Sequence, residues 1–137
     1  MRVILDTNVF VSGVFFTGPP ARILEAWSAG QLSLVISPQI LDEYYRVGVR
    51  LAEQYPDVDL NPAVALLAVE AEIVEPSKLP EPVADDPDDD KFLACAKSAG
   101  VSVIVSGDKH LLDVSGWESI DVLTPRQFLD RYLKADS

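Results

Sequence analysis

Four acidic residues are the side chains whose types and positions in this sequence could do chemistry: Asp6, Glu43, Asp90 and Asp108. Carboxylates that lie close together repel one another, and they stay ionised together only when cations lie between them. Oxygen ligands without histidine or cysteine select Mg²⁺ or Mn²⁺. If the four residues share a site, we therefore expect metal-assisted hydrolysis of a phosphodiester bond.

The elements that must position these acids alternate between strands and helices. Strands are expected at residues 2–5, 32–36, 73–74, 101–105 and 122–123, and helices at 21–29, 38–54, 63–70, 89–99, 109–113 and 125–133, with loops at 13–20 and 75–88. This alternation predicts an α/β fold with a parallel sheet covered on both faces. Ligands bind outside the carboxyl ends of such strands, where Asp6 and Asp108 are expected to lie.

The other two acids are placed by their helices. Glu43 falls one to two turns into the helix that Ser37 and Pro38 should begin, close to its buried side. Asp90 lies in the first turn of another helix, where the helix dipole favours an anion. Asp90 is preferred as the third ligand because it precedes the buried stripe by one turn. Asp89 is then the helix cap, and it remains an alternative ligand.

Length and composition limit the classes of protein. With 137 residues and 48% hydrophobic content, we expect a single domain over residues 1–137. No apolar run is long enough for a membrane span, and an early acid argues against a signal peptide. The one cysteine, Cys95, is expected to be buried in a protein of the reducing cytoplasm. A Ser-His-Asp hydrolase is not supported, because no Gly-x-Ser-x-Gly motif is present.

The net charge of −11 is unfavourable for a protein that binds nucleic acid. Bound metal would offset part of it. Lys91 and Lys109, each next to a proposed ligand, are the best candidates to contact a substrate phosphate. Trp27 and Trp117 could stack on bases, although the spacing of Trp27 is that of a core residue.

Four segments, in order, resemble the successive motifs of the PIN-domain family, most closely its VapC-like branch of putative toxins from toxin–antitoxin systems. They are Leu-Asp-Thr-Asn-Val at residues 5–9, Ile-Ser-Pro-Gln-Ile-Leu-Asp-Glu at 36–43, Asp-Pro-Asp-Asp-Asp-Lys-Phe-Leu-Ala at 86–94 and Val-Ser-Gly-Asp-Lys at 105–109. The resemblance implies a three-layer α/β/α sandwich around a central parallel sheet. It also implies that Asp6, Glu43, Asp90 and Asp108 bind one or two Mg²⁺ or Mn²⁺ ions, with Asn8, Ser106 and Thr7 as polar neighbours.

The same resemblance carries expectations about activity and partners. Proteins of this kind are endoribonucleases, often homodimeric and often restrained by a cognate antitoxin protein. One rival is a catalytically silent PIN-like module that binds RNA or protein. Another is a phosphotransfer fold. A haloacid-dehalogenase phosphatase would need an acid where Asn8 stands, and a response regulator would need an Asp directly after residues 32–36.

Overall fold

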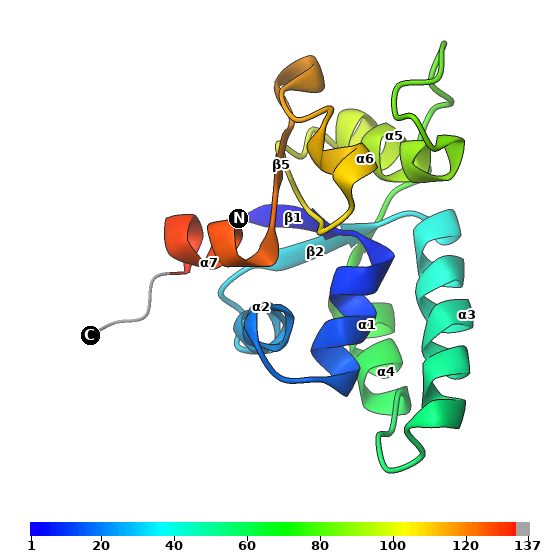
Figure 1. Ribbon diagram of the computed structural model, residues 1–137, viewed down its shortest axis with the longest axis vertical. Coiled ribbons are helices and arrows are strands. Elements are labelled where there is room, and N and C mark those ends of the chain that lie inside the picture. Colours follow the sequence, from blue (N-terminus) through cyan, green and yellow to red (C-terminus); the bar gives the residue numbers. More distant parts are fainter. Residues whose placement is uncertain (134–137) are drawn as a thin grey trace.

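The strands form one parallel sheet in the order β3-β2-β1-β4-β5, in a computed structural model that describes residues 1–133 (Figure 1). The strands are β1 (Arg2–Leu5), β2 (Ser33–Ile36), β3 (Glu72–Ile73), β4 (Val103–Val105) and β5 (Asp121–Leu123). All neighbouring pairs are parallel. The last four residues of the expected domain, 134–137, lie outside the described residues. The predicted parallel sheet is confirmed.

The helices lie on the two faces of this sheet. They are α1 (Thr7–Phe15), α2 (Pro19–Ser28), α3 (Pro38–Gln54), α4 (Asn61–Glu70), α5 (Asp90–Ala99), α6 (Lys109–Leu112) and α7 (Pro125–Tyr132), with short 3₁₀ turns η1 (Pro87–Asp89) and η2 (Trp117–Ser119). Connections between parallel strands are right-handed, so helices that lead toward β3 and helices that lead toward β5 cover opposite faces. Figure 1 shows α1 to α4 below the sheet and α5 and α6 above it. The three-layer α/β/α sandwich is therefore confirmed.

Helix α1 is the element that the sequence pattern did not predict. It begins directly after Asp6, whose backbone carbonyl accepts hydrogen bonds from the amides of Val9 and Phe10. The expected loop at residues 13–20 is wrong at both ends, because α1 continues to Phe15 and α2 already begins at Pro19. Much of α1 is buried and apolar, and its hydrophobic residues follow one another without the polar stripe that reveals a surface helix.

Helix α3 begins where Ser37 and Pro38 predicted. The Ser37 hydroxyl accepts a hydrogen bond from the Ile40 amide at 3.2 Å, and proline occupies the first helical position. Further along α3, the ring of Tyr44 stacks on Phe10 with centroids 4.3 Å apart, and its hydroxyl donates to the carbonyl of Leu5. These contacts attach α3 to the carboxyl end of β1, one residue after Glu43.

The core fills the space between the sheet and both helical layers. Cys95 is fully buried and Trp27 is 5% exposed, so both are core residues as expected. Burial raises the pKa of the Cys95 thiol to about 11, which makes it a poor nucleophile. Within residues 1–133, no helix is both long enough and apolar enough to cross a membrane.

Candidate active site

The candidate site lies at the carboxyl ends of β1 and β4, which are neighbours at the centre of the sheet. Leu5 pairs with Val105, and the Asp6 amide donates to the Val105 carbonyl at 2.9 Å. The chain leaves β1 toward β2 and leaves β4 toward β5, in opposite directions. A parallel sheet opens into a crevice at such a point. Asp6 and Asp108 both follow strands that end there.

Asp6 is held in place by a serine from the neighbouring strand end. The residue is only 5% exposed, and its Oδ2 accepts a hydrogen bond from the Ser106 hydroxyl at 2.7 Å. Burial raises the pKa of Asp6, as do the charges of Asp108 and Glu43, whereas the hydrogen bond from Ser106 lowers it. The Asp6 carboxylate is therefore an oriented anion in a place that disfavours its charge.

The same serine also positions Asp108. The backbone amide of Asp108 donates to the Ser106 hydroxyl at 2.9 Å, so one side chain connects both acids. Asp108 Oδ1 in turn accepts the amide of His110 at 2.8 Å and caps the short helix α6. These bonds fix the orientation of the Asp108 carboxylate relative to Asp6.

The third acid beside Asp6 and Asp108 is Asp89, at the end of η1. The residue is 7% exposed, and its Oδ2 is a buried oxygen without a hydrogen-bond partner, the one such side-chain atom in residues 1–133. Burial raises the pKa of Asp89 to about 7, with further contributions from the charges of Asp108, Asp6 and Asp86 and from a side-chain hydrogen bond with Asp108. An unpaired buried carboxylate oxygen is costly. It therefore indicates a missing partner, such as a cation.

Asp90, the residue expected to be the third ligand, binds the backbone of the preceding loop. Its two oxygens accept the backbone amides of Ala84 at 2.8 Å and Val83 at 3.2 Å. Successive residues on a helix point about 100° apart, so the two adjacent aspartates face different surroundings. The charges of Asp6 and Asp108 raise the pKa of Asp89, whereas the Asp90 carboxylate binds the loop amides.

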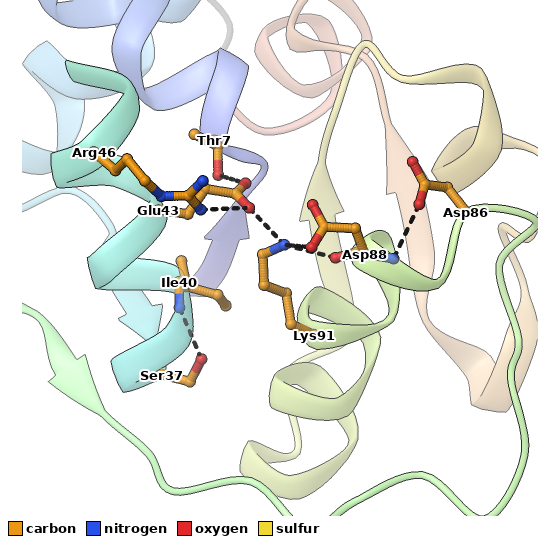
Figure 2. Close-up of polar contacts among 8 residues, drawn as sticks. All are labelled: Thr7, Ser37, Ile40, Glu43, Arg46, Asp86, Asp88 and Lys91. Atoms are coloured by element: carbon orange, nitrogen blue, oxygen red, sulfur yellow. Dashed lines mark hydrogen bonds and ion pairs between the residues drawn. The ribbon is translucent and has the colours of Figure 1, made fainter. Parts of the chain in front are cut away.

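Glu43 reaches the site from α3 with both oxygens already bonded (Figure 2). Oε1 accepts the Thr7 hydroxyl, and Oε2 lies 2.6 Å from the Lys91 ammonium. Arg46 is more distant, at 3.9 Å. Thr7 directly follows Asp6 in the chain, so its hydrogen bond brings the Glu43 carboxylate to the residue next to Asp6. Thr7 therefore orients the Glu43 carboxylate.

The remaining expected site residues differ in their surroundings. Asn8 and Lys109 are exposed to solvent. Lys91 is an ion-pair partner of Glu43 and of Asp88. No role was expected for Asp88. The three-residue spacing from Asp88 to Lys91 is the signal that could have found this pair.

The acids suit a hard divalent cation in donor type and in charge. Their side chains do not surround a common point in this structure. No three His, Cys, Asp or Glu side chains among residues 1–133 lie together in an arrangement that could already hold a metal ion. However, Asp6 and Asp89 both have raised pKa values, and Asp89 carries an unpaired buried oxygen. Oxygen donors of this kind suit Mg²⁺ or Mn²⁺. Asp6, Asp89 and Asp108 are the residues whose donor type and surroundings suit such an ion.

The fold and the site together define a class: an α/β sandwich with carboxylates at the switch point of a parallel sheet. A sequence profile described as PIN domain matches residues 2–110. The chain belongs to the PIN-domain family. The match covers each of the four segments quoted above. No curated protein matches the chain. PIN domains are generally metal-dependent nucleases.

Proposed function

We propose that this protein is an endoribonuclease that hydrolyses RNA phosphodiester bonds with Mg²⁺ or Mn²⁺. In this proposal Asp6, Asp89 and Asp108 hold the ion, and Glu43 lies beside them. The observation that carries the proposal is the buried, unpaired Oδ2 of Asp89, in the field of Asp6 and Asp108. Asp90 leaves the proposed ligand set because both of its oxygens bind backbone amides.

The chain's own residues would orient this chemistry. A bound divalent ion would supply charge to polarise a phosphate oxygen and to activate water. Ser106 holds the Asp6 carboxylate and the Asp108 backbone in a fixed relation, and the His110 amide holds Asp108. Tyr44 fixes the end of β1 through the Leu5 carbonyl. Such preorganisation reduces the reorganisation that reaction would otherwise require.

The proposed test is cleavage of a labelled RNA mixture by the purified protein. We expect cleavage with Mg²⁺ or Mn²⁺, none with EDTA, and recovery when the ion is restored. Asp6→Asn should lower the rate by at least about a hundredfold, because removing one group that acts on the transition state costs roughly that much. The control is Lys97→Met, which changes a charge in the last turn of α5, away from the site, and should cleave normally. Cleavage that persists in EDTA would contradict the proposal.

The biological role that we propose is the toxin of a type II toxin–antitoxin system, acting on RNA in the cytoplasm. A homodimer and a cognate antitoxin protein are parts of this proposal, and its support is the resemblance to VapC-like toxins. Expression of the chain should arrest growth of the host cell. Co-expression of a small neighbouring gene for an antitoxin should relieve the arrest. An Asp6→Asn chain that is equally toxic would contradict a role through RNA cleavage.

A second candidate function is a catalytically silent PIN-like module that binds RNA or a protein. Two observations favour it. Both Glu43 oxygens already have partners, and no three acidic, histidine or cysteine side chains among the described residues are arranged to hold a metal ion. RNA binding without cleavage, across several RNAs and with both ions, would support this alternative over the nuclease.

A further inference from the structure

Lys91 contributes a positive charge inside the acidic site. It is the second residue of α5, and its side chain is only 16% exposed. Figure 2 shows it directed between Glu43 of α3 and Asp88 of η1. Burial by itself lowers the pKa of Lys91, but the hydrogen bonds to Glu43 and Asp88 outweigh it and raise the pKa above its usual value. The ammonium lies between the carboxylates of Glu43 and Asp88 and forms an ion pair with each.

Three acceptor oxygens surround the Lys91 ammonium; the Asp88 carbonyl accepts a hydrogen bond, and carboxylate oxygens of Glu43 and Asp88 form ion pairs with it. The nitrogen lies 2.6 Å from Glu43 Oε2, 3.2 Å from Asp88 Oδ1 and 2.6 Å from the Asp88 carbonyl oxygen. A lysine ammonium has three N–H groups. A contact between Lys91 and a substrate phosphate, as the sequence led us to expect, would require one of these bonds to break.

The four carboxylates of the site therefore fall into two sets. Glu43 has a partner for each oxygen, Thr7 for Oε1 and Lys91 for Oε2. Asp89, in contrast, has a buried oxygen with no partner, next to the charges of Asp6 and Asp108. The set of Asp6, Asp89 and Asp108 therefore lacks a cation to balance its charge. At Glu43 the protein supplies the cation itself.

We propose that Lys91 is a built-in monovalent cation that occupies Glu43, so that the site takes one divalent ion, at Asp6, Asp89 and Asp108, and not two. This inference rests on the proposed function, since it assumes that the site binds a divalent ion. One divalent ion leaves the four carboxylates and Lys91 with a residual negative charge. A second divalent ion would have to displace an ammonium from a largely buried ion pair with Glu43. Lys91 thus acts as a positioning residue that sets the metal count.

The test is the stoichiometry and affinity of Mn²⁺ binding to the full-length chain, measured by calorimetry and by counting free Mn²⁺ with electron paramagnetic resonance. The wild-type chain should bind one ion. Lys91→Met should bind a second, because it frees a Glu43 oxygen, whereas Lys91→Arg should still bind one. Lys97→Met removes the same charge from the same helix, away from the site, and should also bind one ion.

Glu43→Gln gives an independent arm that does not need the Lys91→Met chain to fold. It should change the affinity of the single ion by less than about threefold, whereas Asp89→Asn should weaken it by at least about tenfold. In the Lys91→Met background, Glu43→Gln should remove the second ion. Circular dichroism would verify that each variant is folded.

The possible failures are distinguishable. Two ions bound by the wild-type chain, or only one bound by a folded Lys91→Met chain, would overturn the role of Lys91 and leave the proposed metal site standing. A tenfold loss of affinity in Glu43→Gln would do the same, because Glu43 would then be a ligand of the first ion. If the wild-type chain binds no Mn²⁺ at all, the proposed function itself fails.

Discussion

At the scale of single residues, two adjacent aspartates at the start of α5 have different surroundings. The carboxylate of Asp90 accepts two loop amides, and hydrogen bonds of this kind stabilise an anion. The carboxylate of Asp89 is buried against other negative charges and lacks such bonds at Oδ2. Asp90 therefore stabilises the loop through its two hydrogen bonds, whereas the buried charge of Asp89 is stabilising only when something else compensates it.

Substitution of each aspartate by asparagine should separate these two roles. Asp89→Asn should weaken Mg²⁺ or Mn²⁺ binding by at least about tenfold, while the metal-free protein should become more stable because a buried charge is removed. Asp90→Asn should lower the free energy of unfolding by about 1–3 kcal/mol, because asparagine offers one acceptor oxygen to two amides.

Calorimetric metal titration and urea unfolding of the two variants measure these effects. A loss of metal binding in Asp90→Asn, with unchanged stability, would reverse the assignment of the two residues. Preserved metal binding in a folded Asp89→Asn chain would remove Asp89 from the ligand set.

At the scale of elements, α1 and α2 approach each other closely at Gly13. A Cβ atom at this position would lie 2.8 Å from the Pro20 carbonyl oxygen and 2.7 Å from a methyl carbon of Leu24. Because part of the obstacle is backbone, the helices would have to separate to admit a side chain. The close packing of α1 matters for the site, since Asp6 and Thr7 stand at the start of this helix.

Gly13→Ala should therefore destabilise the protein, although alanine is the better helix former. We expect a loss of about 1–3 kcal/mol in the free energy of unfolding, the usual cost of overpacking, which exceeds the propensity gain of about 1 kcal/mol. Ser12→Ala, the neighbouring residue in the same helix, is the control and should have a small effect. Thermal and urea unfolding measure both. An increase in stability for Gly13→Ala would mean that α1 and α2 pack less closely than described.

At the scale of the whole molecule, the charge of −11 disfavours both the compact state and the approach of RNA. Added salt of any kind should screen the general repulsion. A divalent ion that binds a particular site adds a separate stabilisation, because it binds only the folded state. At a concentration one hundred times its dissociation constant, that stabilisation is about 2.7 kcal/mol.

MgCl₂ should therefore raise the melting temperature more than NaCl of the same ionic strength. The excess should be absent in Asp6→Asn, which lacks one proposed ligand, and retained in Lys97→Met. Differential scanning calorimetry over a range of ion concentrations measures the effect. Equal shifts for the two salts would indicate screening alone and would argue against a specific divalent site.

The sequence by itself determined the layered α/β fold and placed Asp6 and Asp108 at one edge of the sheet. Both conclusions follow from local patterns: short apolar runs between helices predict parallel strands, and the residues after such strands share an edge. Ser37 and Pro38 likewise fixed the start of α3, because a cap is a contact between residues close in the chain.

Only the tertiary structure decided which acids meet and what each one contacts. The choice between Asp89 and Asp90 depends on the turn η1 that enters α5, and sequence spacing does not specify its phase. The ion pair of Lys91 with Glu43 joins residues from α5 and α3, and the bond from Thr7 to Glu43 joins α1 and α3. Helix α1 itself was missed because a helix buried over much of its surface has no polar stripe. Each of these features depends on contacts between distant segments, which form only when the layers pack.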